Sequence, residues 1–375
     1  MNRPLQRLLA AAIGLLLPLL IPGVPAHADS IRDAEWHLTY LDMAHARQVS
    51  EGDGITVAVV DSGINGNHPD LEGNVLQGTS MVPGHPGNGW EDTDEHGTAM
   101  AGDIAAHGHG GSGVLGIAPR AKILPLQVNS GTHLADSDVV AAAIDEAVRR
   151  NARVISMSIG DLAGSSALQA AVEDAQRADV VVVAAMGNRP KATRVSCPAC
   201  YHGVVAVGGV DRTGNLAAVS ITGPQMLVSA PAVDIESLTV HSGYSAGSGT
   251  SDAAAITAGV VALIRSKYPK MSAVDVIHRL TATATDKGPK GRDDQYGYGI
   301  VNPYAALTAD VPSVDPTASP STSAATPSPS APPAATGNKS AGIAVVVLFV
   351  AVAVLAMMWI RRAAARYRRR IHDDN

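Results

Sequence analysis

Short apolar runs alternate along the middle of the chain with segments whose apolar residues recur at helical spacing. Five such runs, rich in β-branched residues, predict buried strands at residues 55–60, 122–128, 153–159, 180–185 and 203–210. Between them, residues 136–151 and 166–178 have the spacing of amphipathic helices. Strands that are apolar on both faces and alternate with helices are typical of a parallel sheet covered by helices on both sides. The predicted fold class is therefore α/β.

Two further apolar segments lie near the ends of the chain. Residues 1–28 combine Arg3 and Arg7 with an apolar run and a final Ala-His-Ala, the pattern of a cleaved secretory signal peptide. Residues 341–360 are uncharged and apolar, and as a helix they are long enough to cross a bilayer. The tail, residues 361–375, contains six arginines, and an excess of basic residues marks the cytoplasmic side. The sequence predicts a single-pass cell-membrane protein with an extracytoplasmic N-terminal body.

Composition separates this body from the membrane segment. Residues 311–339 are rich in Pro, Ser, Thr and Ala and nearly free of charge, so they cannot form a core and predict a disordered stalk. The body before the stalk divides into an N-terminal extension, residues 29–54, and a main domain, residues 55–310. Without the signal peptide and the tail, 20 basic and 32 acidic residues remain, a net charge of −12. Such an acidic body excludes nucleic acid as a partner.

Four polar residues of the body could together perform chemistry. Asp61 directly follows the predicted strand 55–60, and Asn188 comes shortly after the predicted strand 180–185. Functional residues gather at the carboxyl ends of parallel strands. His96 opens a run of small residues at helical spacing. Ser251 precedes an Ala-rich run, where a serine is also an ordinary helix N-cap. A carboxylate, an imidazole, an amide and a hydroxyl are the groups that serine acyl transfer requires, and their chain order is that of subtilisin.

Five motifs in this order resemble those of the subtilisin-like serine peptidases. They are VAVVDSGINGNHPDL from residue 57, HGTAMAGDIAA from 96, VISMSIG from 154, AAMGN from 184 and GTSDAAAITAG from 249. The resemblance implies a three-layer fold, with a central parallel seven-stranded sheet between two layers of helices. It also implies that Ser251 is the nucleophile, His96 the general base and Asp61 the carboxylate that orients His96. By the same match, Asn188 donates to the oxyanion.

The resemblance further implies where a substrate binds. Ser158, Ile159 and Gly160 match the strand that borders the substrate cleft, and Ser196 lies near the base of a pocket. The acidic stretch 91–95 precedes His96. We expect it either to be a solvated loop or to line the cleft and favour basic substrate side chains.

The only cysteines, Cys197 and Cys200, lie in the segment that matches a wall of this pocket. Two cysteines of an exported protein tend to pair, and we interpret these as a local disulfide that shapes the wall. A reduced redox pair and half of a zinc site are the alternatives. No second C-x-x-C completes a zinc site, and no ligand spacing supports calcium, so we expect no metal and no cofactor.

The motif around the nucleophile departs from the family pattern. Asp252 directly follows Ser251, Ala255 stands where the family has proline, and Met186 stands where a small residue is usual. A carboxylate beside the nucleophile can disfavour a neighbouring oxyanion. None of the three departures removes a catalytic atom.

The order of the segments resembles that of the mycosins, the subtilases of actinobacterial type VII secretion systems. The extension 29–54 is too short to be a prodomain with its own core, which also suits mycosins. The resemblance implies protein or peptide substrates, contact with membrane lipid through one helix, and association with type VII secretion components. A function of another class stays open, that of a structural subunit or pseudo-protease that stabilises a secretion complex without catalysis.

Overall fold

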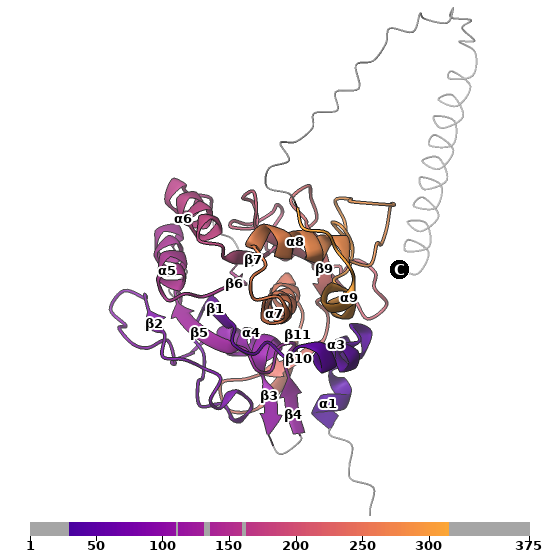
Figure 1. Ribbon diagram of the computed structural model, residues 1–375. Coiled ribbons are helices and arrows are strands. Elements are labelled where there is room, and N and C mark those ends of the chain that lie inside the picture. The colour runs from indigo at the N-terminus through magenta and orange to yellow at the C-terminus, as the bar shows by residue number, and fades with distance from the viewer. Residues whose placement is uncertain (1–29, 110–111, 131–135, 160–162, 315–375) are drawn as a thin grey trace, which may run out of the picture. The chain divides into compact units, whose positions relative to one another are not determined.

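The structure, a computed structural model, describes residues 30–109, 112–130, 136–159 and 163–314 (Figure 1). All of them belong to one compact unit. The predicted signal peptide, the membrane helix 341–360, the tail and nearly all of the stalk lie outside the described residues, so they stay predictions. Within the part of the chain that the structure describes, no helix is long and apolar enough to cross a membrane.

A parallel sheet of seven strands forms the centre of the domain. Its order is β2-β5-β1-β6-β7-β8-β9, and every neighbouring pair is parallel. The strands are β1 Thr56–Asp61, β2 Thr79–Ser80, β5 Lys122–Gln127, β6 Val154–Met157, β7 Val181–Ala185, β8 Val205–Val210 and β9 Val228–Pro231. The predicted α/β class and the seven-stranded sheet are confirmed, and all five predicted strands are present. The sequence pattern missed β2, which has two residues, and β9, which ends in proline.

Helices and two small hairpins complete the domain. The helices are α1 Ser30–Ala34, α2 Trp36–Tyr40, α3 Met43–Val49, η1 Pro69–Leu71, α4 His96–Ala105, α5 Ser137–Arg149, α6 Ser166–Arg177, α7 Thr250–Lys267, α8 Ala273–Ala282 and α9 Pro303–Thr308. The hairpins pair β3 His107–His109 with β4 Ser112–Leu115, and β10 Ile235–Leu238 with β11 Tyr244–Gly247. Both predicted amphipathic helices are found, as α5 and α6.

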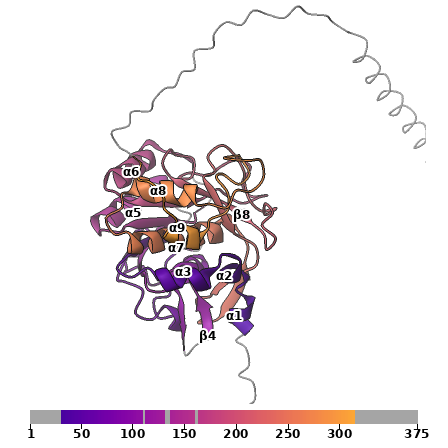
Figure 2. The ribbon, with the colours of Figure 1, turned by 45° about the vertical axis from the view of Figure 1, so that its right-hand side comes forward.

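Helices cover both faces of the sheet, which makes the three layers. Val57 and Val59 of β1 belong to the core that α4 and α7 share, whereas Ala58 and Val60 belong to the core beneath α5 and α6. Figures 1 and 2 show α5 and α6 as one pair, separate from α7 and α9. Helix α7 is buried along almost its whole length, so the residues at its first turn have a rigid support.

The N-terminal extension packs on the main domain as three short helices, α1, α2 and α3 (Figure 2). The side chains of Arg32, Trp36 and Arg47 donate hydrogen bonds to carbonyl oxygens of the main domain, at 3.0, 3.0 and 2.6 Å. The Ser50 hydroxyl donates to the carbonyl oxygen of Leu263 in α7 at 3.0 Å. The extension is therefore an integral part of the domain surface.

Candidate active site

Strand β1 and helix α4 bring Asp61 and His96 together. Asp61 is the last residue of β1 and is buried, and His96 is the first residue of α4. The Nδ1 atom of His96 lies 2.8 Å from Oδ1 of Asp61. A β-carbon at Gly97 would lie only 2.1 Å from the carbonyl oxygen of Gly63, so glycine is required for α4 to begin this close to β1.

His96 is a strong base in this setting. The negative charge of Asp61 raises the pKa of His96 to about 9, against the opposing effect of burial. The hydrogen bond that the imidazole donates to Asp61 and the charges of Asp252 and Asp92 also contribute to this raised pKa. The imidazole can therefore take up a proton, and Asp61 fixes which ring nitrogen stays free for it.

The acidic stretch before His96 divides into two kinds of residue. Asp92 accepts hydrogen bonds from the Ser62 hydroxyl at 2.9 Å and from the backbone and hydroxyl of Thr98 at 2.9 and 2.6 Å. Asp92 therefore braces the loop on β1 and α4. Glu91, Asp94 and Glu95 are exposed beside His96, and their effect on substrate choice stays a prediction.

Ser251 lies in the first turn of α7 and is 8% exposed. Its hydroxyl donates to the carbonyl oxygen of Ser158 at 3.2 Å, and the Ser158 hydroxyl donates back to the carbonyl oxygen of Ser251 at 3.0 Å. This reciprocal pair fixes the end of β6 beside the first turn of α7. Ile159 follows and is partly buried, whereas Gly160 lies outside the described residues.

Asn188 follows β7 and is oriented by its contacts with Thr250. Its Oδ1 accepts from the Thr250 backbone N–H at 2.8 Å and from the Thr250 hydroxyl at 3.0 Å. The Thr250 hydroxyl in turn accepts from the N–H of Gly187 at 3.1 Å. With its oxygen occupied, the side chain turns its Nδ2 toward Gly249, where a β-carbon would lie 3.0 Å away. The amide donor of Asn188 therefore lies beside Gly249, which is two residues before Ser251 in the chain.

A pocket adjoins Asn188. It has a volume of about 160 Å³ and is lined by Ala163, Lys191, Ala192, Thr193, Arg194, Val195 and Ser196. Ser196 is buried, its N–H donates to the carbonyl oxygen of Met186 at 3.2 Å, and its hydroxyl lies 3.0 Å from where a β-carbon of Gly187 would stand. Ser196 therefore lines a pocket, and its place near the base of the substrate pocket stays a prediction.

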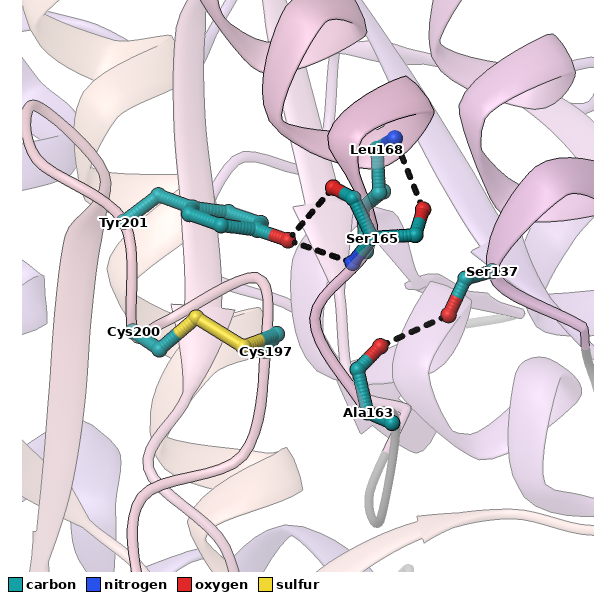
Figure 3. Close-up of a disulfide and its surroundings, with 7 residues drawn as sticks. All are labelled: Ser137, Ala163, Ser165, Leu168, Cys197, Cys200 and Tyr201. Atoms are coloured by element: carbon teal, nitrogen blue, oxygen red, sulfur yellow. Dashed lines mark hydrogen bonds between the residues drawn. A yellow bond between two sulfur atoms is a disulfide. The ribbon is translucent and has the colours of Figure 1, made fainter.

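Cys197 and Cys200 form a disulfide directly after this pocket (Figure 3). Tyr201, the next residue, exchanges hydrogen bonds of 3.0 Å with the backbone N–H and carbonyl of Ser165 (Figure 3). These bonds hold the disulfide loop against the start of α6. Among the described residues, no group of three His, Cys, Asp or Glu side chains could hold a metal ion.

Two buried carboxyl groups lie close to the site. They are Asp252, which departs from the family motif and is 5% exposed, and Asp103, which the sequence motifs do not single out and which is 1% exposed. Asp103 stands seven residues after His96, on the same face of α4. The signal in the sequence is that Asp103 is the one acid in HGTAMAGDIAA, whose other residues apart from His96 are small or apolar.

The parallel sheet carries a hydrogen-bonded carboxylate and imidazole at the end of β1 and the start of α4, and α4 packs against α7, whose first turn contains Ser251. Residues 52–299 match the model of the subtilase family. The chain belongs to that family and is a serine-type endopeptidase.

Curated relatives are similar over the main domain. The thermostable alkaline protease of Halalkalibacterium halodurans is 37% identical over 269 residues, which is 71% of this chain and 72% of the relative. Subtilisin E of Bacillus subtilis is 39% identical over 68% of this chain and 66% of its own length. Subtilisin DY of Bacillus licheniformis is 38% identical over 68% of this chain and 92% of its own length.

Solved structures of MycP1 are similar in fold. A serine protease MycP1, described as an essential component of the type VII (ESX-1) secretion system, is 31% identical with a TM-score of 0.67, covering 76% of this chain and 90% of that one. MycP1 with its N-terminal propeptide removed is 28% identical with a TM-score of 0.67, covering 74% of this chain and 98% of that one. The expected resemblance to mycosins is confirmed.

Proposed function

We propose that this chain is a membrane-anchored, extracytoplasmic endopeptidase that cleaves protein or peptide substrates through an acyl-enzyme formed on Ser251. The observation that carries the proposal is the 2.8 Å contact between His96 and Asp61, made at the start of α4, the helix that packs against α7. An oriented, strongly basic imidazole next to a serine at a helix N-terminus suits nucleophilic catalysis.

The reaction would begin when the Ser251 hydroxyl turns from the Ser158 carbonyl toward Nε2 of His96. His96 takes the hydroxyl proton as Oγ attacks the substrate carbonyl carbon, and Asp61 stabilises the imidazolium. The amide of Asn188 donates to the oxyanion. His96 then protonates the leaving amine, and a water molecule, deprotonated by His96, hydrolyses the acyl-enzyme.

The secretion context is part of the proposal. It is supported by the similarity to MycP1, which is described as a component of type VII secretion, and by the predicted signal peptide, stalk, membrane helix and tail. Contact with membrane lipid through the predicted helix 341–360 and with other secretion components follows from that arrangement.

A fluorophosphonate probe tests the catalytic role. We expect the full-length protein to be labelled at Ser251, and Ser251→Ala and His96→Ala to abolish labelling. In subtilisin, a relative of this chain, removing either counterpart costs about a millionfold in turnover. Absence of labelling in a folded wild-type protein would contradict the proposal.

One observation favours a second candidate, that of a structural subunit without catalysis. The Ser251 hydroxyl is hydrogen-bonded to the Ser158 carbonyl oxygen. Asp252, the next residue, is buried, and a negative charge on it would disfavour an oxyanion formed at Ser251. Secretion assays separate the two functions. Secretion that is lost on deletion of the protein but retained with Ser251→Ala would favour the structural role.

A further inference from the structure

The pocket beside Asn188 carries positive charge on a body whose sequence is acidic overall. Residues 189–194 contain Arg189, Lys191 and Arg194 and no acid. Lys191 and Arg194 line the pocket, which has a volume of about 160 Å³. Within the described part of the chain, no acidic side chain lines it. A side chain that enters the pocket therefore meets two cations.

Lys191 and Arg194 are not engaged elsewhere in the domain. Both residues are exposed, and across the described ranges the ion pairs are formed by other cations. Arg189 differs from them, because its Nε donates to the carbonyl oxygen of Ser220 at 3.3 Å and the residue does not line the pocket. The same segment thus supplies two cations to the pocket and a third that lies outside it.

The cationic wall of the pocket is fixed to the residues around the proposed oxyanion donor. The backbone N–H of Ala192 donates to the carbonyl oxygen of Asn188 at 2.8 Å, and that of Ser196 donates to the carbonyl oxygen of Met186 at 3.2 Å. These two bonds lie at either end of the lining segment 191–196. Because they anchor the wall directly to Asn188, a side chain in the pocket would belong to a substrate residue close to the cleaved bond.

The opposite wall, at Ala163, is braced against the same segment. The carbonyl oxygen of Ala163 accepts from the Ser137 hydroxyl at 2.7 Å (Figure 3). Two residues further on, Ser165 is bonded through its backbone to Tyr201, which directly follows the disulfide loop (Figure 3). Both walls are therefore held in place by the protein itself, and a substrate need not order them on binding.

We infer that this pocket receives a carboxylate side chain of the substrate, Asp or Glu, and that Lys191 and Arg194 select it. An ammonium and a guanidinium group form charge-assisted hydrogen bonds with a carboxylate, whereas a basic side chain would be repelled. A cavity of about 150 Å³ accommodates a molecule the size of benzene, so the pocket suits one side chain. The inference rests on the proposed function and names a substrate class for that site.

The acidic loop before His96 does not contradict this assignment. Its exposed residues Glu91, Asp94 and Glu95 do not line the pocket. Any preference for basic side chains that they cause would therefore act at another position of the substrate.

Cleavage of matched peptides by the full-length protein tests the inference. A peptide library with mass-spectrometric readout first locates the cleaved bond, and each neighbouring position is then varied among Glu, Gln and Lys in quenched peptides blocked at both ends. At one position we expect kcat/KM for Glu to exceed that for Gln about threefold to thirtyfold, with Lys lowest. High salt should reduce the ratio, because the cations are exposed. Equal rates for Glu and Gln at every position would overturn the inference.

Variants assign the preference to the two cations. The double variant Lys191→Gln, Arg194→Gln should bring the ratio of Glu to Gln to about one while it keeps the kcat for the Gln peptide, and Lys191→Glu, Arg194→Glu should favour the Lys peptide. Arg189→Gln is the matched control, since it removes one positive charge from the same segment outside the pocket, and it should leave the ratio unchanged. A ratio that persists in the double variant, or falls equally in Arg189→Gln, would contradict the assignment.

Peptide binding separates this inference from the proposed function. Fluorescence anisotropy with Ser251→Ala should show tighter binding of the Glu peptide than of the Gln peptide, and the difference should disappear when Lys191→Gln and Arg194→Gln are added. If the wild type is not labelled by the fluorophosphonate probe but this difference is present, the proposed function fails and the inference holds. If the wild type cleaves peptides without a preference for Glu, the inference fails and the proposed function holds.

Discussion

At the scale of the residue, the site depends on side chains in which one polar atom is held by a hydrogen bond and the other is left free. Asn188 is the clearest case, since Thr250 occupies its oxygen and leaves its NH₂ group for another acceptor. The same holds for His96, whose Nδ1 is bound to Asp61, leaving Nε2 free for a reacting hydroxyl. Preorganised groups of this kind need not reorient when charge develops.

In the proposed mechanism the Asn188 amide donates to the oxyanion and not to the bound substrate, so Asn188→Ala should lower kcat about 10²- to 10³-fold with little change in KM. Steady-state kinetics on a peptide substrate measure this, with Asn215→Ala in an exposed turn as the control. Thermal unfolding must accompany the kinetics, because the variant also leaves Thr250 without its acceptor. A loss expressed only in KM would argue against an oxyanion role.

At the scale of the element, the sequence pattern predicted the sheet and its two amphipathic helices but not the structure of the extension. Helices α1, α2 and α3 have five, five and seven residues, too few to be stable without tertiary contacts. What holds them is specific bonding to the main domain, as by Trp36 and Arg47, which no local periodicity encodes.

The site residues, too, could be predicted only where a local sequence feature marks them. Asp61 and Asn188 could be predicted because one ends a strand and the other closely follows one, and parallel strands have their carboxyl ends at the same edge of the sheet. Asp103 could not, because its burial depends on how α4 packs against α7. The hydrogen bond between Ser251 and Ser158 joins residues 93 apart in the chain, and likewise follows only from the folded structure.

Helix α2 should make the extension sensitive to acid through His37. Burial, together with the positive charge of Arg47, lowers the pKa of His37 to about 3, and its Nδ1 has no hydrogen-bond partner among the described residues. The unfolded segment binds a proton below pH 6.5 whereas the folded one does not. The contribution of neutral His37 to the free energy of unfolding is therefore fully present above pH 6.5. It falls by up to about 1.4 kcal/mol per pH unit between pH 6.5 and pH 3.

Hydrogen exchange of residues 30–50 at pH 7 and pH 4.5 tests this prediction. The protection factors, which are the exchange rates corrected for the intrinsic effect of pH, should fall at the lower pH in the wild type and much less in His37→Leu. His45→Leu is the matched control, because the His45 side chain is 63% exposed and lies in the neighbouring helix α3. Equal acid sensitivity in wild type and His37→Leu would show that other groups are responsible.

At the scale of the whole molecule, one ion pair connects the central helix to the sheet and to two further helices. Arg265 of α7 is fully buried and donates to the Asp179 carboxylate at 3.1 Å and to the Asp179 carbonyl at 2.6 Å. Asp179, in the turn between α6 and β7, also accepts from Arg153 at 3.0 Å and from the backbone N–H of Ala273 in α8. The Asp179 carboxylate thus accepts from three places, namely α7, the residue before β6 and the start of α8.

Asp179→Ala should lower the free energy of unfolding by about 3 kcal/mol, since it leaves Arg265 buried without its counter-ion. We expect the lower end of the range for buried pairs because the Asp179 side chain is 42% exposed. Urea unfolding measures the change. Asp174→Ala, which removes an exposed partner of Arg177, should cost no more than about 0.5 kcal/mol.

Asp179 also has a φ of 62°, in the left-handed region that aspartate and asparagine tolerate better than alanine. Asp179→Asn keeps this backbone preference and removes only the charge, so it separates the two contributions. If Asp179→Asn is nearly as destabilised as Asp179→Ala, the ion pair carries the effect. If it is close to wild type, the turn does, and the buried Arg265 is satisfied by the carbonyl oxygens of Asp179 and Met271. The first result is the one we expect, because a buried guanidinium retains its charge.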